Sequence, residues 1–494
     1  MGVRASSRHR RNLVVIANWR DGTHPSAGGA ELVCERLARS LVEWGHDVVV
    51  VTAAVAGQPR KEQTEDGYWI VRRGGTFTVY AWALAWMLWY RKYIRGVIDS
   101  QNGIPFFSPL VVKRKTPVLM LLHHVHADQF PLYFPPLAAK AGQWLERTGA
   151  GLVYRDRTIV AVSPTTRTGA RQQLGLKGDI VVIPPGCETA VSSLPGIRAR
   201  SATPRIVCVG RLVVHKGTSN VIDAVPSLLA EFPDLEVHLV GEGPERPALE
   251  DQVRQLGLGD HVFMRGGLDS DGRDELMRTA WLSVNASEGE GWGLTVIEAN
   301  AFGVPVVAYR RPGLRYSIRN EETGWLIDED RPLASAVAEA LHEMSDEAAA
   351  AAMAKRARQW AAQFTWDEMA DQVRSLLRAE AGRLAQSPNN RRTITDLATV
   401  VRIPMDLMPH GVVPSFRATD KCVVGPGELV VLLRNTDTET ARIALRRAGF
   451  SPAAIEDPRI RIAVAEPVDL VSPAISVVQA PRVRPVRGED ALAG

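Results

Sequence analysis

Short apolar runs alternate with amphipathic stretches through the first part of the chain. Two runs, Leu13–Ala17 and Asp47–Thr52, predict strands, and apolar residues at helical spacing between them predict a helix that ends near Gly45. The same pattern predicts further strands at 96–100, 117–122, 158–162 and 180–184. Because these runs are apolar throughout, we expect a parallel sheet covered by helices on both faces.

The pattern pauses at a Ser- and Pro-containing segment near residue 190 and then starts again. Beyond it we expect strands at 205–209, 236–240, 262–265, 281–286, 304–309 and 325–327. Helices are expected between them at 218–230, 247–256 and 294–301. We therefore predict an α/β protein with two doubly wound, Rossmann-like domains, which would face each other across a cleft at the carboxyl ends of their strands.

The predicted domain boundaries follow the breaks in this pattern. The first domain is expected to span 12–190 and the second 204–365. A capping-box pattern at Thr365–Glu368 starts one more helix, 366–382, in which the Thr hydroxyl and the Glu carboxylate satisfy free amides. A polar segment precedes a small α/β appendage, 393–480, to which the sequence assigns no role.

The most apolar run of the chain is Thr78–Tyr90, which contains three tryptophans. It is shorter than the ~20 residues that a bilayer-spanning helix needs. Two interpretations remain for it. One is a buried helix of the first domain, and the other is an interfacial helix that contacts anionic lipid, with Arg91, Lys92 and Arg95 directly after it.

Composition narrows the class of protein. The 494 residues contain 59 Lys and Arg against 55 Asp and Glu, so the net charge of +4 does not indicate a nucleic-acid-binding protein. Only nine of the 59 basic residues are lysine, which is typical of GC-rich bacterial coding. The four cysteines (Cys34, Cys187, Cys208 and Cys422) form no CxxC pair, and no secretory signal is evident. We expect a cytoplasmic protein without a structural metal.

Three glycine-containing loops follow predicted strands and so reach the cleft. Gly28 and Gly29 precede a helix, whose free amides and dipole favour an anion. The segment from Gly210 to Gly217 contains Arg211 and Lys216, two cations suited to a diphosphate. The tight turn at Gly243 is either structural or one wall of a slot for a nucleotide base.

The fourth loop, residues 287–299, carries the strongest signal. Glu290 and Glu298 flank a Gly-rich turn and lie eight residues apart. Glu298 falls early in the following helix, where the dipole favours a carboxylate that accepts ribose hydroxyls. Glu290, on the loop, is suited to the hydroxyls of a sugar. The turn between them adds the candidate nucleotide-sugar-binding residues Gly291, Trp292, Gly293, Leu294 and Thr295.

Together these residues resemble glycosyltransferase family 4, whose members have the two-domain GT-B architecture. The resemblance covers about residues 12–382 and rests on the E-x7-E motif Glu290…Glu298 and the G-R-x4-K-G segment with Arg211 and Lys216. It implies a retaining transferase that needs no metal, in which Arg211 and Lys216 hold the diphosphate, Glu298 the ribose and Glu290 the donor sugar.

One histidine and one loop complete the comparison with the family. His123 begins a His-His-Val-His segment after a predicted strand, and it matches by position the family histidine that contacts the donor sugar. The same three histidines are also a conceivable metal cluster. The loop Pro184–Glu188 departs from the Pro-Asn-Gly-Val-Asp pattern that is common in the family.

The sequence thus predicts transfer of a sugar from a nucleoside-diphosphate sugar to a glycan, lipid or small-molecule acceptor. We expect the protein to work in the cytoplasm. The Trp-rich run leaves open a peripheral contact with the inner face of the membrane. Two alternatives share the pattern. One is a sugar-nucleotide epimerase or hydrolase, and the other is a non-catalytic sugar-nucleotide-binding scaffold.

Overall fold

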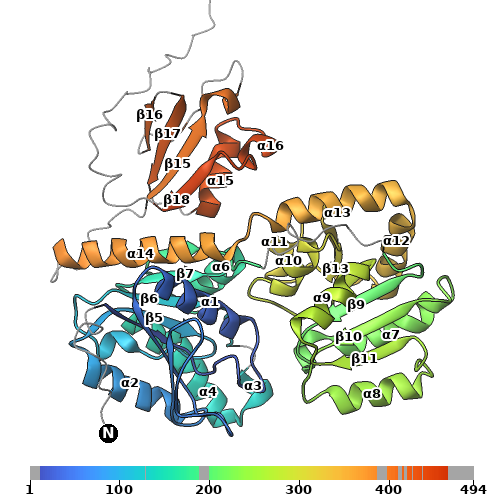
Figure 1. Ribbon diagram of the computed structural model, residues 1–494, viewed down its shortest axis with the longest axis horizontal. Helices are drawn as coiled ribbons and strands as arrows, with labels where there is room; N and C mark the ends of the chain where they lie inside the picture. The colour runs from blue at the N-terminus through green and yellow to red at the C-terminus, as the bar shows by residue number, and fades with distance from the viewer. Residues whose placement is uncertain are drawn as a thin grey trace, which may run out of the picture. The chain divides into compact units, whose positions relative to one another are not determined.

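The computed structural model describes residues 12–127, 130–187, 200–386 and 398–464, apart from short gaps in the last range at 410–413, 415, 417–419, 426, 435 and 437. The chain forms two compact units, residues 1–393 and 394–494. The larger unit contains both doubly wound sheets (Figure 1). The mixed α/β architecture with two Rossmann-like halves that the sequence predicts is therefore confirmed.

The first sheet has eight strands in the order β3-β4-β2-β1-β5-β6-β7-β8. Every neighbouring pair is parallel except β3 with β4 at one edge. The central strands are buried on both faces, as their continuous apolar runs require. The strands are β1 (Leu13–Ala17), β2 (Asp47–Thr52), β3 (Lys61–Gln63), β4 (Trp69–Arg72), β5 (Ile94–Gln101), β6 (Val118–Leu122), β7 (Thr158–Ala161) and β8 (Ile180–Val182).

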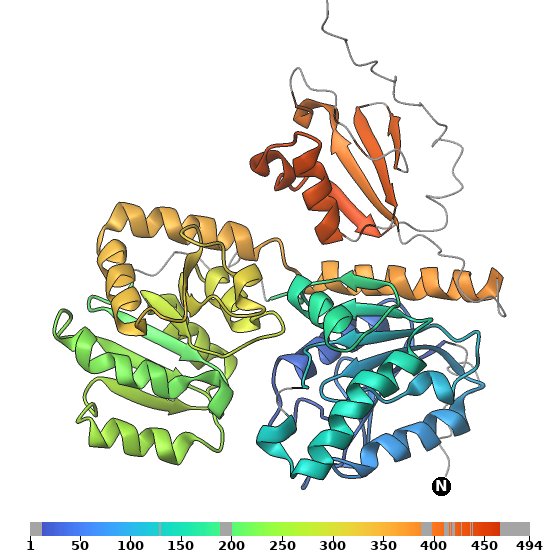
Figure 2. The same cartoon turned by 180° about the vertical axis from the view of Figure 1, so that it is seen from behind.

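Helices cover both faces of this sheet (Figures 1 and 2). They are α1 (Gly29–Glu43), α2 (Thr78–Tyr90), η1 (Ser108–Leu110), α3 (Phe130–Tyr133), α4 (Pro136–Trp144), the π-helical turn η2 (Leu145–Gly149), α5 (Ala150–Val153) and α6 (Pro164–Gln172). The Trp-rich run forms α2, which buries Val79, Ala83 and Met87 along one face. Trp89 is 81% exposed on another face, so the helix is part of the core and of the surface at once.

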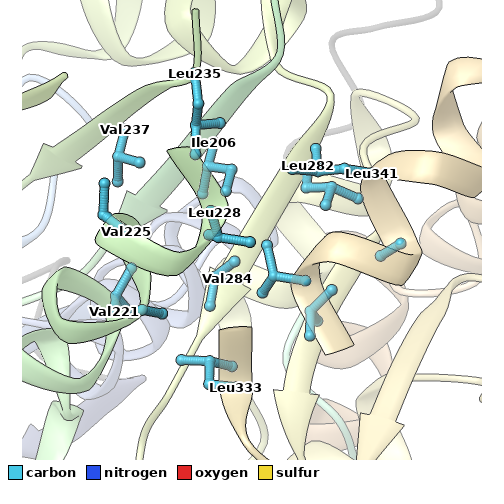
Figure 3. Packing of buried hydrophobic residues seen from close by; sticks show 14 of the residues in the cluster. Ile206, Val221, Val225, Leu228, Leu235, Val237, Leu282, Val284, Leu333 and Leu341 are labelled. Atoms are coloured by element: carbon cyan, nitrogen blue, oxygen red, sulfur yellow. The ribbon is translucent and has the colours of Figure 1, made fainter. Parts of the chain in front are cut away.

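The second sheet has six parallel strands in the order β11-β10-β9-β12-β13-β14. They are β9 (Arg205–Val209), β10 (Glu236–Val240), β11 (Val262–Gly266), β12 (Leu282–Asn285), β13 (Val306–Tyr309) and β14 (Gly324–Ile327). The helices are η4 (Val214–Lys216), α7 (Thr218–Leu229), α8 (Arg246–Gln255), α9 (Ser270–Thr279), α10 (Leu294–Ala301), α11 (Leu314–Ser317), α12 (Leu333–Ser345) and α13 (Glu347–Ala361). Figure 3 shows how aliphatic side chains of α7 and α12 pack against this sheet.

The helix α14 (Trp366–Gln386) follows the second domain but packs on the first. The Arg374 guanidinium lies 4.0 Å from the ring centroid of Trp44, at the end of α1. Arg383 donates a 2.9 Å hydrogen bond to the carbonyl of Asp156 before β7. Both figures show α14 lying along the first domain, so the chain crosses between the domains twice.

The smaller unit contains an antiparallel sheet in the order β16-β17-β15-β18. Its elements are β15 (Ala398–Pro404), η5 (Met405–Leu407), β16 (Lys421–Val424), β17 (Glu428–Arg434), α15 (Thr438–Arg447), α16 (Pro452–Ile455) and β18 (Arg461–Val464). Val401, Val431 and Leu445 are fully buried in its own core. These strands and helices lie within the range 393–480 that the sequence gives to a small α/β appendage.

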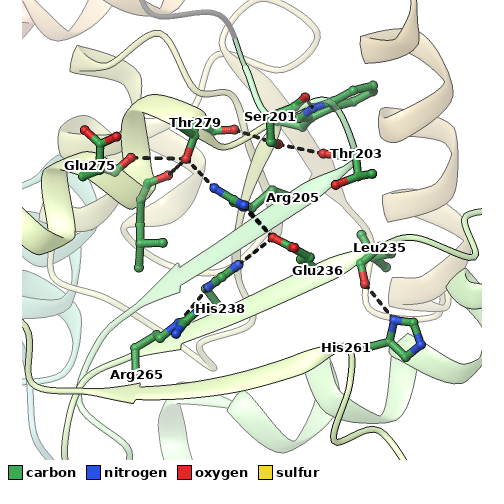
Figure 4. A network of polar contacts seen from close by, with 12 residues as sticks. Ser201, Thr203, Arg205, Leu235, Glu236, His238, His261, Arg265, Glu275 and Thr279 are labelled. Carbon is green, nitrogen blue, oxygen red and sulfur yellow. Dashed lines mark hydrogen bonds and ion pairs between the residues drawn. The ribbon is translucent and has the colours of Figure 1, made fainter.

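A polar network on the second sheet fixes the protonation state of one buried histidine (Figure 4). The Nε–H of Arg265 donates to His238 Nδ1 at 3.0 Å, so this nitrogen carries no proton. The other ring nitrogen, Nε2, therefore donates to Glu236 at 3.1 Å. Arg205 completes the network with bonds of 2.9 and 2.6 Å to the same Glu236 oxygen. His238 is 1% exposed, and its neutral ring joins three neighbouring strands.

We expect His238→Leu to lower the free energy of unfolding by about 1–3 kcal/mol, because the two hydrogen bonds of a buried ring are lost at about 0.5–1.5 kcal/mol each. His238→Gln should recover most of this loss, since an amide accepts from Arg265 and donates to Glu236. The network also predicts a pH dependence. Burial, with nearby Arg265 and Arg205, lowers the pKa of His238, although Glu236 opposes the shift.

The unfolded chain therefore binds more protons than the folded chain below the ordinary histidine pKa of 6.5. Stability should fall as the pH drops below that value, and it should fall less in His238→Gln. Chemical denaturation at about pH 7.5 and about pH 5.5 checks both effects. An equal pH response in the two proteins would contradict this role of His238.

Candidate active site

The order of the strands brings the predicted loops together. In each sheet the strand order reverses at one point, between β1 and β5 in the first and between β9 and β12 in the second. Loops after strands at such a point diverge and leave a crevice at the carboxyl edge of the sheet. The loops that carry Gly28, Arg211 and Glu290 follow β1, β9 and β12, which explains why residues far apart in sequence meet.

A cavity of about 260 Å³ lies where these loops meet. Both domains line it. The first domain contributes Arg20, Gly28, Gly29, Ala30, Glu31, Val33, Asn102, His123, His124, His126, Val162 and Pro185. The second contributes Gly210, Arg211, His215, Lys216 and the run Gly289–Thr295. Most of the predicted site residues thus share one cavity.

Glu31, in the first turn of α1, holds the first glycine loop in place. The side chain of Glu31 is 1% exposed and accepts a 2.7 Å hydrogen bond from the amide of Gly28. It also pairs with Arg20 at 3.1 Å and accepts from Asn102 at 3.2 Å. One buried carboxylate therefore fixes the loops after β1 and β5 together. Glu31 follows Gly28 and Gly29 closely in the sequence. The sequence alone does not show whether a carboxylate at this position binds a ligand or holds the loop in place.

The glycines of this loop lie directly against the second domain. A Cβ atom on Gly29 would lie 2.7 Å from the Leu294 side chain, and one on Gly28 would lie 3.5 Å from Arg211 Nε. A Cβ atom at position 29 would therefore require the Leu294 side chain to move. The absence of a side chain here keeps the loop backbone beside the cationic loop of the other domain.

Lys216 and Glu290 form an ion pair within the cavity. Ser287 donates a 2.9 Å hydrogen bond to the same Glu290 oxygen. Burial alone would raise the pKa of Glu290, but Lys216 and Ser287 together hold the pKa below its ordinary value. Glu290 therefore stays ionised at neutral pH. Lys216 can therefore exchange Glu290 for another anion without taking up a proton.

The turn after Glu290 sets the start of α10. Gly293 has a φ angle of +96°, which glycine adopts at little cost, and Leu294 begins the helix. Trp292 is 5% exposed, and its ring lies 5.0 Å from that of Phe364, edge to face. Thr295 accepts from Asn285 at 3.4 Å. This packing leaves little freedom to the loop that lines the cavity.

Three of the histidines that line the cavity, His123, His124 and His215, are uncharged at neutral pH. Burial is the main cause, and it lowers the pKa of His123 and of His124 to about 3. Burial also lowers the pKa of His215 to about 4, with Lys216 and Arg211 adding to the effect. His123 Nε2 lies 2.9 Å from Ser100 Oγ at the end of β5. Among the described residues, no group of three or more His, Cys, Asp or Glu is placed to hold a metal ion.

Glu146 binds the backbone of the loop that contains His123, His124 and His126, here called the histidine loop. The sequence did not single this residue out. It lies on the π-helical turn η2, is 0% exposed, and accepts a 2.8 Å hydrogen bond from the amide of His126. It also accepts from Gln101 at 3.3 Å. A π-helical turn often marks a functional place, but the sequence carries no periodic signal for one.

Two predicted residues lie outside this cavity lining. Gly243 packs against the loop after β9, where an added Cβ would lie 2.1 Å from the carbonyl of Leu212. Glu298 is half-buried on α10 and is not among the residues that line the cavity. Their nucleotide-binding roles stay predictions.

Family models match both halves of the larger unit. The model described as Glycosyltransferase Family 4 matches residues 27–191, and that described as Glycosyl transferases group 1 matches 196–360. The chain belongs to glycosyltransferase family 4. Residues 361–494, which include the smaller unit, lie beyond both matches.

Relatives and solved structures agree with the family 4 assignment. The chain is 30% identical over 255 residues to a GDP-mannose-dependent alpha-(1-6)-phosphatidylinositol monomannoside mannosyltransferase of Mycobacterium tuberculosis. This match covers 48% of this chain and 64% of the relative, which is just under two thirds of the relative's length. A protein of the same name from Mycolicibacterium smegmatis is 29% identical over 68% of this chain and 91% of its own. Sucrose-phosphate synthase from Thermosynechococcus elongatus shares the fold, with a TM-score of 0.63 at 22% identity, over 76% of this chain and all of that one.

The closest contact between the domains in this family 4 protein depends on Gly291. A Cβ atom there would lie 2.0 Å from the carbonyl oxygen of His123, whereas a Cβ on Gly289 would meet nothing within 4 Å. Thr166 donates from its hydroxyl to the carbonyl of Gly291 at 3.3 Å, which adds a second contact across the domains.

We expect Gly291→Ala to lower the free energy of unfolding by about 1–3 kcal/mol, as overpacking does, because a backbone oxygen must move. Gly289→Ala is the matched control and should stay within about 0.5 kcal/mol of the parent. Denaturant unfolding of the three proteins measures both. Equal values for the two variants would show that the domains do not hold this contact in solution.

Proposed function

We propose that this protein transfers a sugar from a nucleoside-diphosphate sugar to a hydroxyl group of an acceptor, with retention at the anomeric carbon and without a metal ion. One observation carries the proposal. The cationic residues Arg211 and Lys216 line the same cavity as the glycine loop of the other domain. Cations and helix-terminal amides that converge from two sides suit a diphosphate.

The ion pair of Lys216 with Glu290 suggests how the donor binds. In the proposed complex the diphosphate replaces Glu290 as the partner of Lys216, and Arg211 binds the same phosphates. Glu290, still ionised, then accepts hydrogen bonds from hydroxyls of the donor sugar. Each group keeps its charge, so binding requires no proton transfer.

In the proposed reaction the acceptor oxygen forms a bond to the anomeric carbon while the bond from that carbon to the diphosphate oxygen breaks. The electron pair leaves with the diphosphate, and the acceptor proton passes to a phosphate oxygen. Arg211, Lys216 and the loop amides stabilise the negative charge that develops on the diphosphate. His123, held neutral, lies beside the donor sugar and donates or accepts a hydrogen bond without adding charge.

The relatives suggest which donor to test first. Two of them are named as using GDP-mannose and as acting on phosphatidylinositol monomannoside. We therefore expect GDP to bind best among nucleoside diphosphates, and an inositol phospholipid or its mannoside to accept the sugar.

Calorimetric titration with GDP, UDP, ADP and dTDP, without metal and in the presence of EDTA, tests the site. Lys216→Ala and Arg211→Ala should each weaken the stabilisation of the leaving group by about 2.7–4 kcal/mol, or 10²–10³ in kcat, by analogy with a lost oxyanion donor. Lys355→Ala, an exposed lysine on α13, is the control. Consumption of the donor without an acceptor would favour a hydrolase or epimerase, and nucleotide binding without turnover would favour a scaffold. Full activity in either cavity variant would refute the assignment.

We further propose that the first domain binds the cytoplasmic face of a membrane through a surface patch on α2 and α4. Among the described residues, none of the helices is both long and apolar enough to cross a bilayer. The patch comprises Phe77, Leu88 and Trp89 of the α2 region and Leu137 and Trp144 of α4, all of which are exposed. Phe77 and Phe134 have ring centroids 5.8 Å apart, which places the start of α2 beside the segment before α4.

Co-sedimentation with vesicles tests this patch. The wild type should bind vesicles that contain phosphatidylglycerol more strongly than pure phosphatidylcholine vesicles, because Arg91, Lys92 and Arg95 follow α2 and are exposed. Trp89→Gln should weaken binding several-fold, since a largely exposed aromatic ring is lost from the interface. Lys355→Ala again serves as the control, and equal binding by all three proteins would exclude the patch.

A further inference from the structure

A second cavity, of about 380 Å³, adjoins the candidate active site. It shares four lining residues with the first cavity, His124, His215, Gly289 and Glu290. The rest of its wall comes from Val125 and α6 of the first domain and from Glu288, Pro312 and Arg315 of the second. A ligand in this cavity would lie beside Glu290 and His124 without contacting Gly28 or Gly29, which line the first cavity alone.

The face that α6 turns toward this cavity is polar along its whole length. Thr165, Thr168 and Gln172 recur at intervals of three and four residues and so share one side of the helix. The other side is anchored by Ala170, which is buried in the core of the first domain. Ser163 caps the helix by accepting from the amide of Thr166 at 3.0 Å, which fixes the start of the polar face.

The hydrogen bonds of these side chains leave both donors and acceptors for a ligand. Thr168 donates its hydroxyl proton to the carbonyl of Pro164 at 3.0 Å, so its oxygen lone pairs face outward as acceptors. Thr165 accepts from the amide of Gly313 at 3.4 Å, so its hydroxyl proton is left to donate. Gln172 adds an exposed amide that both donates and accepts. Such a mixture matches a ligand whose hydroxyl groups also do both.

The charges of this wall disfavour a diphosphate. Glu288 and Glu290 contribute carboxylates, and Arg315 is the one Lys or Arg among the residues that line the cavity. The first cavity, in contrast, is lined by Arg20, Arg211 and Lys216. The nucleotide therefore belongs to the first cavity, and a neutral ring bearing several hydroxyls suits the second.

We propose that the second cavity binds the acceptor, and that the acceptor presents a polyhydroxylated ring, a cyclitol or a hexose, to Thr165, Thr168 and Gln172. This assignment rests on the proposed transferase function. It deepens that function by naming the acceptor class and the residues that bind it. The acceptor hydroxyl would meet the donor sugar at the shared wall, beside Glu290 and His124.

The test separates acceptor binding from donor binding. The double variant Thr168→Val with Gln172→Leu keeps side-chain size but removes the polar groups. The Lys177→Ala variant changes an exposed residue beyond the end of α6 that does not line the cavity. Transfer from GDP-mannose, UDP-glucose and UDP-N-acetylglucosamine is measured to five acceptors: phosphatidylinositol and its monomannoside in detergent micelles, inositol 1-phosphate, methyl α-mannoside and maltotriose. The Kd for GDP and UDP is measured by calorimetry.

We expect the double variant to raise the KM for the acceptor roughly tenfold, as the loss of two hydrogen bonds would, with nucleotide Kd unchanged. Lys177→Ala should change neither. An unchanged acceptor KM, or a nucleotide Kd that rises with it, would overturn the proposal. If nucleotide binds but none of the ring acceptors takes the sugar, the assignment of acceptor class is wrong while the transferase function stands. If no nucleotide binds, the proposed function itself fails.

Discussion

The approach of the Gly291 backbone to the carbonyl of His123 is the constraint on which the candidate site depends. Position 291 has no room for a Cβ atom, because that atom would lie 2.0 Å from a backbone oxygen of the other domain. The contact closes one side of the cavity and brings Glu290 to the histidine loop. A glycosyl transfer needs a site that excludes water, and two rigid sheets can provide one only where their loops touch.

The charged groups of the site are neutralised by one another in the arrangement described. Glu31 pairs with Arg20 inside the first domain, and Glu290 pairs with Lys216 inside the second. The two pairs differ in what holds them. Glu31 also accepts from the amide of Gly28 and from Asn102, so its carboxylate has no capacity to spare for a ligand. Glu290 is bound by Lys216 and Ser287 through one of its two oxygens, and this is the carboxylate that a ligand can recruit.

The sequence predicts the two parallel sheets well because buried parallel strands are continuous apolar runs. β1, β2 and β9 have the predicted bounds. The edge strand β3 was missed because Lys61–Gln63 is short and polar, which is how an exposed edge avoids pairing with other chains. Its neighbour β4 was missed as well. In the C-terminal unit β15 and β16 were also missed. β15 pairs antiparallel with β17 across the long connection after Pro404, which no local pattern reveals, whereas β16 pairs antiparallel with β17, the next strand along the chain.

The only site residues that the sequence predicts are those that lie in loops rich in glycine or charged residues and that match the motifs of the family. Arg211, Lys216 and Glu290 were found in this way, and the structure brings them into one cavity. Glu146 was missed because a lone glutamate on an amphipathic stretch usually lies on a solvated face, and only the tertiary structure shows that it is buried under His126. The polar face of α6 was missed for a related reason, since threonine and glutamine are ordinary on a helix surface.

The path of the chain between the domains limits how the site can open. The amide of Cys187 donates to the carbonyl of Phe364 at 3.0 Å, and the backbone of Gly186 packs so closely on Trp366 that an added Cβ would lie 2.2 Å from its amide nitrogen. The end of the first domain and the start of α14 are therefore joined side by side, and any separation of the domains must pivot close to this junction. Phe364 also packs edge to face on Trp292, the residue after Gly291. A rotation of the domains about Phe364 would therefore move the loop that contains Gly291 and Trp292. The residues at the pivot thus pack directly against the residues that make the contact with His123.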